Sequence, residues 1–362
     1  MKMLIKLIVA SAFLYSGLWR LLFAVNRLLT RTQPAFVLMY HRVVPQGTAA
    51  HEQPWLIFRS LPGIVVSPEM FQRQITFLTE HYSVISLETL IDHIDNKKSL
   101  ERPSVVITFD DGWRDNYEYA LPVLKYASTP ATIFLSTGFV GTTRIFWPER
   151  LLYLFRYGDG TKLSVSDLPR ELLSAKLETL LIEMAAGDTD ALESRLDECI
   201  RILKSARPEA REELIAVLSK QFLRNGADQI KERVVLDWNE IELMQRDNIS
   251  FGSHGVNHEL FTEISPDDVE RELRESAETI GARLHPAILT LAYPNGNYNE
   301  MVRTCAVELG YRCAVTVNRG VASTAEDMMT LPRINIHEDV SKGLKGDFSP
   351  ALFAWHINRS IL

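Results

Sequence analysis

Two hydrophobic patterns alternate along this chain of 362 residues. Short apolar runs, such as residues 36–43 ("FVLMYHRV") and 104–109 ("SVVITF"), are typical of buried strands. Apolar residues at helical spacing follow them, for example in residues 67–82, where Ser67 suits an N-cap and Pro68 the first helical position. Strands that alternate with helices predict parallel βα units, either closed into a barrel or wound as an open sheet.

The same alternation continues through most of the chain. It predicts strands within residues 83–86, 131–140, 249–254, 287–294, 313–318 and 334–338, and helices within residues 87–95, 116–127, 238–247, 265–284 and 299–310. Between about residues 150 and 235 the spacing is helical throughout, and no β-rich run interrupts it. We therefore expect a barrel domain over residues 36–345 with an all-helical insertion over about 150–235, followed by a C-terminal tail over residues 346–362.

The N-terminal segment is apolar with interspersed basic residues. Residues 7–19 carry no charge, which is too short a stretch for a bilayer-spanning helix of about 20 residues. On one continuous helix the basic residues would share a face: Lys2, Lys6, Arg20, Arg27 and Arg31. A basic stripe on an apolar helix suits an anionic membrane surface, so we expect residues 1–31 to form an amphipathic, membrane-associated helix. The alternative is a helix that packs on its own domain.

The net charge and the cysteine spacing indicate which partners and which cellular location to expect. The net charge is -7 and no basic run offsets it, which argues against a nucleic-acid partner. The three cysteines have no metal-ligand or disulfide-framework spacing and are typical of a reducing compartment. We expect a peripheral protein on the cytoplasmic face of the membrane. An uncleaved anchor with the barrel outside is the alternative.

Polar residues that can carry chemistry follow four of the predicted strands. They are Asp110 with Asp111, His254 with His258, the segment 293–296 ("YPNG"), and His337. In an α/β barrel the C-terminal ends of the strands form the face where active sites are built. Their shared placement therefore predicts a single site.

His254 and His258 are four residues apart, so on a helical turn both imidazoles could bind one metal ion. Two histidines with one carboxylate, here Asp111, form a donor set common in catalytic zinc sites. Asp110 would then stay free to act as a general base. The alternative is a structural Asp-Gly turn before Gly112, and the spacing alone does not decide between them.

Three motifs in this order, "TFDDG", "SHGVNH" and "LAYPNG", resemble the polysaccharide deacetylases with a NodB homology domain, carbohydrate esterase family 4. The start "VLMYHRV" is similar to the exopolysaccharide deacetylase subgroup. The resemblance covers roughly residues 36–148 and 236–338. It implies a distorted (β/α)7 barrel that removes N- or O-acetyl groups from sugars with a divalent metal, usually zinc.

The resemblance also implies roles for single residues. Asp110 matches the general base, and Asp111, His254 and His258 match the metal ligands. The backbone N–H of Asn295 matches the oxyanion donor, with Tyr293 beside it in the substrate-binding motif, and His337 is the candidate for the general acid.

Two features depart from the family pattern. The third motif usually begins with an Arg that orients the catalytic base, and Ala292 occupies that place here. Arg333, near His337, is a candidate substitute. The helical insertion has no counterpart in compact members of the family.

The sequence thus predicts a metal-dependent hydrolase. Its partner would be an acetylated sugar or oligosaccharide of a bacterial surface polysaccharide, or the lipid-linked precursor of one. One alternative is a deformylase or other C–N hydrolase that acts on a lipid-linked sugar. The other is a non-catalytic carbohydrate-binding or scaffold protein, which the full set of candidate ligands and base disfavours.

Overall fold

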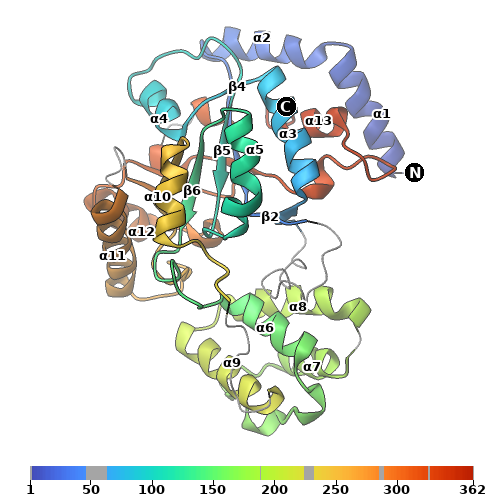
Figure 1. The fold of residues 1–362 in the computed structure, drawn as a ribbon, viewed down its shortest axis with the longest axis vertical. Helices are drawn as coiled ribbons and strands as arrows, with labels where there is room; N and C mark the ends of the chain where they lie inside the picture. Colours follow the sequence, from blue (N-terminus) through green and yellow to red (C-terminus); the bar gives the residue numbers. More distant parts are fainter. Residues whose placement is uncertain are drawn as a thin grey trace.

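The computed structural model describes residues 2–45, 63–187, 189–223, 232–284, 289–324 and 327–361. A sheet of parallel strands forms the centre of the molecule, and helices surround it (Figure 1). The strands of the main sheet run in the order β10-β1-β5-β6-β7-β8-β9, and β4 pairs with β5 on the side. Adjacent strands in this sheet pair in parallel.

The strands are β1 (Ala35–Tyr40), β2 (Arg42–Val43), β3 (Val65–Val66), β4 (Ser83–Val84), β5 (Ser104–Phe109), β6 (Ala131–Leu135), β7 (Ile249–Ser253), β8 (Thr290–Ala292), β9 (Cys313–Val315) and β10 (Arg333–Asn335). The N–H of Thr316, just past β9, donates to Leu331, just before β10, and the N–H of Leu331 donates back to Ala314. These bonds nearly close the sheet into a barrel, which confirms the predicted (β/α)7 class.

The helices around the barrel are α3 (Pro68–His81), α4 (Leu87–Asp95), α5 (Leu121–Tyr126), α10 (Trp238–Arg246), α11 (Pro266–Leu284), α12 (Glu300–Glu308) and α13 (Pro350–Asn358). Ser67 caps α3 by accepting from the N–H of Met70, as its sequence predicts. The expected helix over 116–127 begins as a π-helical turn at Asn116–Ala120, because Pro122 has no N–H to donate into a regular α-helical pattern.

The predicted strands are generally longer than the observed ones. The strand expected over 131–140 ends at Leu135, and the chain then leaves the sheet as a loop. Residues 287 and 288 of the strand expected over 287–294 lie outside the described residues. All six residues of β1 and of β5 are buried, because both faces of a barrel strand are covered.

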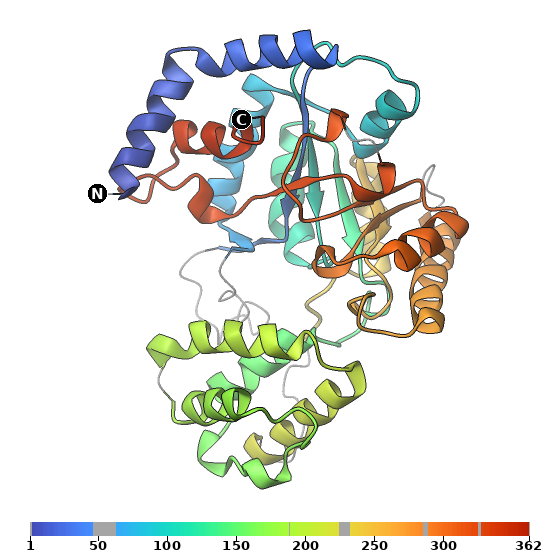
Figure 2. The same ribbon diagram turned by 180° about the vertical axis from the view of Figure 1, so that it is seen from behind.

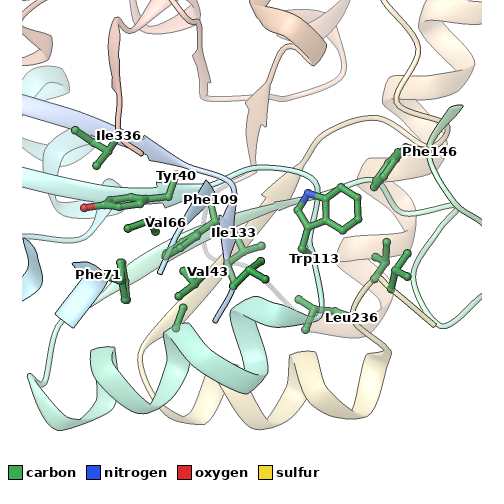
Figure 3. Close-up of a cluster of buried hydrophobic side chains, with 14 of the residues drawn as sticks. Tyr40, Val43, Val66, Phe71, Phe109, Trp113, Ile133, Phe146, Leu236 and Ile336 are labelled. Atoms are coloured by element: carbon green, nitrogen blue, oxygen red, sulfur yellow. The ribbon is translucent and has the colours of Figure 1, made fainter. Parts of the chain in front are cut away.

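The core between the sheet and the helices is rich in aromatic rings (Figure 3). Tyr40 of β1 lies edge-on to Phe71 of α3 at 5.3 Å and stacks on Phe109 of β5 at 5.4 Å, measured between ring centroids. This cluster fixes the carboxyl ends of β1 and β5 next to each other, and the site residues His41, Asp110 and Asp111 follow these ends directly.

The helical insertion consists of α6 (Trp147–Tyr157), α7 (Ala175–Ala185), α8 (Thr189–Leu203) and α9 (Pro208–Phe222). It lies beyond the carboxyl ends of the barrel strands, apart from the other helices (Figures 1 and 2). It begins slightly before the predicted boundary, and its described part is all-helical, as expected; residues 224–231 of the predicted range lie outside the described residues.

The N-terminal segment differs from its prediction, because it forms two helices in place of one. α1 (Lys2–Tyr15) and α2 (Leu18–Thr30) meet at Gly17, which has φ 77°, and the chain bends there by 65°. The basic residues therefore do not form one straight stripe. Among the described residues no single helix is long and apolar enough to cross a bilayer, although α1 and α2 together reach that length and composition.

One face of each N-terminal helix packs on the barrel domain. Phe13 of α1 lies edge-on to Trp355 of α13 at 5.2 Å, and Phe23 of α2 contacts Tyr82 at 6.2 Å, again between ring centroids. α2 lies across the end of the barrel where the strands begin, opposite the helical insertion (Figure 2). The N–H of Ser104, at the start of β5, donates to Pro34 in the segment that joins α2 to β1.

Candidate active site

Asp110 and Asp111 lie at the carboxyl end of β5, where both side chains are buried. Asp111 has φ 74° and Gly112 has φ 75°, so the chain turns sharply at this point. A Cβ at Gly112 would lie 2.9 Å from Cδ2 of Leu135, so the close contact and the positive φ both favour glycine here. The Asp-Gly turn is therefore real, and it directs the two carboxylates toward different partners.

Asp111, His254 and His258 come together as one group. Asp111 Oδ1 lies 3.4 Å from Nε2 of His254 and 3.3 Å from Nε2 of His258. One ligand atom from each residue falls within 4.8 Å of the others, so the three could hold a metal ion. One carboxylate and two imidazoles at this spacing fit a divalent metal with further positions open to water or substrate.

Hydrogen bonds from other residues orient two members of this group. His254 Nδ1 lies 2.7 Å from the carbonyl oxygen of Ala292. Because a carbonyl can only accept, Nδ1 carries a proton, and Nε2 is the nitrogen that faces Asp111. The other oxygen of Asp111 accepts from Nε1 of Trp113 at 2.8 Å. Trp113 is buried and lies under Arg42, whose guanidinium carbon is 4.3 Å from the ring centroid.

The two histidines do not lie on a helical turn, contrary to the prediction. The segment that joins them is a loop, in which Gly255 has φ 77° and His258 has φ 58°. The imidazole centroids are nevertheless 4.9 Å apart. Three residues of the site, Asp111, His258 and Asn295, have left-handed backbones, a conformation that non-glycine residues seldom adopt and that often marks functional sites.

Asp110 is bound by Arg333 in a bidentate pair. Nη1 of Arg333 donates to Oδ1 at 2.7 Å and Nη2 donates to Oδ2 at 2.8 Å. Burial raises the pKa of Asp110, but the charges of Arg333 and His254 outweigh burial and hold the pKa below its ordinary value. Arg333 thus takes the place that the family Arg, absent at Ala292, would fill.

His41, which follows the first predicted strand, is a further residue of this site. β1 pairs with β5 so that Tyr40 is opposite Phe109, which puts His41 beside Asp110 at the strand ends. Its Nε2 lies 3.8 Å from Oδ2 of Asp110. Burial lowers the pKa of His41, and the charge of Asp110 opposes that shift. Its position one residue past a buried strand was the available signal.

His337, the predicted general acid, is not brought to this group. β10 ends at Asn335, and Nδ1 of His337 lies 4.0 Å from Asp339 in the turn that follows. Burial lowers its pKa, and the charges that act on it are those of Asp339, Glu338 and Lys6. The geometry therefore favours His41 over His337 as the imidazole beside the catalytic carboxylate.

The segment after β8 is only partly as predicted. The Tyr293 side chain is buried; its hydroxyl donates to the carbonyl of Met329 at 3.0 Å and its ring stacks on Tyr298. The described contacts of this side chain lie in the core, and its predicted contact with substrate stays a prediction. Asn295, in the following turn, has φ 56°, and its Oδ1 accepts from Nζ of Lys204.

A pocket of about 390 Å³ opens beside His258, between the barrel and the helical insertion. Its walls combine aromatic and polar side chains, among them Phe146, Trp147, Arg144, Asn257 and Glu212. Phe146 also contacts the His258 ring at 5.2 Å between centroids. Flat aromatic faces beside hydrogen-bonding groups suit a sugar ring.

Comparisons with known proteins identify the family of this chain. The family model described as polysaccharide deacetylase matches residues 97–171 and 197–314, which is more than half of the chain. The poly-β-1,6-N-acetyl-D-glucosamine N-deacetylase of Staphylococcus aureus is 34% identical over 122 residues, which cover 32% of this chain and 40% of that protein. The YxkH protein of Bacillus subtilis, named as a polysaccharide deacetylase, is 29% identical over 107 residues, covering 30% of this chain and 37% of that one.

Solved structures share the fold at low identity. The Streptococcus pyogenes deacetylase PplD, in complex with acetate, aligns with a TM-score of 0.56 and 21% identity over 90% of this chain and 99% of that chain. IcaB from Ammonifex degensii aligns with a TM-score of 0.52 and 16% identity over 90% of this chain and 97% of that chain. With the family match and the Asp-Asp-His-His arrangement together, this chain belongs to the polysaccharide deacetylase family of hydrolases.

Proposed function

We propose that this protein is a metal-dependent N-deacetylase that acts on an N-acetylated hexosamine polymer of the bacterial surface. The observation that carries the proposal is the group of Asp111, His254 and His258 directly beside Asp110, which Arg333 holds ionised. The Staphylococcus aureus relative, whose name states poly-β-1,6-N-acetyl-D-glucosamine as substrate, supports the choice of polymer.

Each residue of the site has a separate role in the proposed hydrolysis. When bound by Asp111, His254 and His258, a divalent metal would polarise the acetyl carbonyl and acidify a water molecule. Asp110 accepts a proton from the attacking water, and its bidentate pair with Arg333 keeps this carboxylate ionised and fixed in orientation. The backbone N–H of Asn295 holds the oxygen on which negative charge develops, where one donor is typically worth about 3 kcal/mol.

The departing amine needs a proton, and His41 is the residue placed to deliver it. Its Nε2 is 3.8 Å from Oδ2 of Asp110, so the proton that Asp110 removes from water would reach this imidazole once the two groups close to hydrogen-bonding distance. The C–N bond breaks, the water oxygen remains on the acetate, and the proton passes to the amine nitrogen. Because burial keeps the resting imidazole neutral, it can accept the proton before it donates it.

We also propose that α1 and α2 attach the protein to an anionic membrane surface. Their outer sides expose large apolar side chains: Met3, Leu4, Ile5, Ile8, Val9, Tyr15, Leu18, Leu21, Val25, Leu28 and Leu29. Exposed basic residues lie among them: Lys6, Arg20, Arg27 and Arg31. Apolar insertion combined with basic charge is the pattern of helices that lie in a membrane interface.

This attachment bears on the substrate. Because α2 covers the end of the barrel opposite the helical insertion, its outer side faces away from the catalytic end (Figure 1). A site turned away from the membrane suits a polymer that extends from the surface better than a sugar held at the headgroups. A lipid-linked sugar remains the second candidate, since the exposed apolar surface of α1 and α2 would also suit a membrane-bound substrate.

The membrane proposal is tested by sedimentation of the full chain with vesicles of anionic or zwitterionic lipid. Leu28 and Leu29, 81% and 77% exposed on α2, would be changed to Glu, with Tyr126→Glu, 89% exposed on α5, as the control. Loss of binding to anionic vesicles in the α2 variant alone is expected. Equal binding by both variants would contradict the attachment.

The catalytic proposal is tested by acetate release from β-1,6-linked N-acetylglucosamine oligomers, before and after treatment with a chelator and with zinc restored. Formylated and O-acetylated sugars serve as parallel substrates. Acetate from the N-acetylated oligomers that depends on metal is the expected result. Release of formate would instead indicate a deformylase, and acetate released only from O-acetylated sugars would indicate an O-deacetylase. No product from any of them would reject hydrolysis.

A further inference from the structure

The helical insertion binds the two barrel loops that carry candidate catalytic groups. Lys204, directly after α8, donates from Nζ to Oδ1 of Asn295 in the turn after β8. Arg211 of α9 donates from Nη2 to Glu259, the residue after His258, at 2.5 Å. Two polar links therefore join the helical insertion to the turn of Asn295 and to the loop that carries His258.

The Arg211 side chain, which makes the second of these links, is buried. Arg211 is 1% exposed, and its guanidinium carbon lies 4.8 Å from the ring centroid of Trp147, the first residue of α6. Buried charge pairs of this kind are costly to break, because one charge would be left without a partner. The end of α8 and the start of α9 are thus held in place over the loops after β7 and β8.

Lys204 lies close enough to the metal-ligand group to be influenced by its charge. Its side chain is half-buried, burial lowers its pKa, and the charges of Asp197 and Asp111 oppose that shift. A half-buried ammonium group needs a hydrogen-bond acceptor to compensate its desolvation. Asn295 supplies one.

Asn295 in turn needs support, because its backbone is left-handed at φ 56° and ψ 7°. Residues with a side chain seldom adopt this conformation without support from their surroundings. Gly296 follows at φ 76°, where a Cβ would lie 2.5 Å from Cγ2 of Val317. The Asn295 side chain is held on both sides: Oδ1 accepts from Lys204, and Nδ2 donates to Oδ1 of Asn297 at 2.8 Å.

We propose that Lys204 is a positioning residue of the deacetylase, supplied by the helical insertion. It holds the Asn295 side chain and so fixes the turn that presents the Asn295 backbone N–H to the acetyl oxygen. The inference rests on the proposed function, and it gives the insertion a role in the chemical step. Lys204 acts through Asn295 and does not itself need to touch the sugar.

The test is a double-mutant cycle on kcat with Lys204→Met, Asn295→Gly and the double variant. Glycine keeps the N–H and tolerates the positive φ, so this change removes only the side-chain contact. Each single change should lower kcat roughly ten- to a hundredfold with little change in KM, because the lost contact misplaces a donor used in the transition state. The double variant should lose no more than the single variants, since one contact is removed in each case.

Lys204→Arg, which keeps a donor at this position, should recover part of the rate. Lys176→Met, the same change at an exposed salt bridge on α7, is the control and should match the wild type. Bound metal should be equal in all variants. Multiplicative losses in the double variant, or wild-type kcat in Lys204→Met, would overturn the positioning role while leaving the deacetylase assignment intact. A wild-type protein that releases no acetate would instead reject the proposed function itself.

Discussion

Arg333 and Asp110 form a buried bidentate pair, with nitrogen–oxygen distances of 2.7 and 2.8 Å, between β10 and the carboxyl end of β5. The same guanidinium donates from Nε to the carbonyl of Thr316 at 2.8 Å, so its plane is fixed from both sides. The orienting charge for the candidate base therefore comes from a different strand than in family members that carry Arg at the position of Ala292.

Arg333→Met should shift the acid limb of the pH–rate profile to higher pH. The pKa of Asp110 lies below its ordinary value in the wild type, so the base is ionised down to acidic pH. Without Arg333, the effect of burial dominates and the pKa of Asp110 rises. As pH falls, a larger fraction of Asp110 is then protonated and cannot act as the base. We expect kcat to drop about a hundredfold near neutral pH.

Arg333→Lys is the companion variant, because it keeps the charge and loses the two-pronged geometry. It should fall between the wild type and Arg333→Met in both the rate and the position of the acid limb. Circular dichroism checks that each variant is folded, since breaking a buried pair is costly. An acid limb at the same pH in all three proteins would show that Arg333 does not set the state of the base.

His41→Gln should lower kcat about a hundredfold, whereas His337→Gln should leave it near the wild-type value. His41 lies 3.8 Å from Asp110, and His337 lies beside Asp339. Steady-state kinetics on both variants, with metal content measured in parallel, makes the comparison. The opposite ranking would return the general-acid role to His337.

Trp113→Phe should weaken metal binding by about 10- to 100-fold without unfolding the protein. Phenylalanine keeps a ring under Arg42 but removes the Nε1 donor that orients Asp111 at 2.8 Å. Titration with zinc against a competing chelator measures the affinity, and Trp238→Phe, at the start of α10, is the control. Equal affinity in the wild type and both variants would show that this hydrogen bond does not orient the ligand.

Glu149→Gln should stabilise the protein at alkaline pH. Burial raises the pKa of Glu149 from 4.5 to about 8, and its Oε2 has no hydrogen-bond partner among the described residues. Between these pH values the folded state keeps a proton that the unfolded chain has lost. The free energy of unfolding therefore falls as pH rises through this window, by up to about 1.4 kcal/mol per unit.

Urea unfolding at pH 5 and pH 8.5 measures this effect. The variant should gain on the order of 3 kcal/mol over the wild type between the two pH values. Glu213→Gln, at an exposed position of α9, should show no such gain. Parallel stability curves for the wild type and Glu149→Gln would mean that Glu149 is charged in the folded state.

Most of the fold could be predicted from local patterns in the sequence. Short stretches of sequence were enough to predict the buried strands β1 and β5, the Ser67 cap and the all-helical insertion. They were also enough to place Asp111, His254 and His258 at the ends of strands. Arg333 was a candidate from its place near His337, but its contact with Asp110, like that of His41, depends on the parallel register of β10, β1 and β5, which no local pattern contains. The bend at Gly17 was missed because the apolar spacing continues across it.

The central claim is that Asp111, His254 and His258 bind the metal with which Asp110 works, and one titration tests it most directly. Metal-free protein is titrated with zinc while acetate release from an N-acetylglucosamine oligomer is followed, for the wild type, Asp110→Asn and His258→Ala. Wild-type activity should rise and saturate at about one equivalent. Asp110→Asn should bind the same equivalent without turnover, and His258→Ala should bind weakly. Full activity in the metal-free wild type, or in Asp110→Asn, would contradict this account.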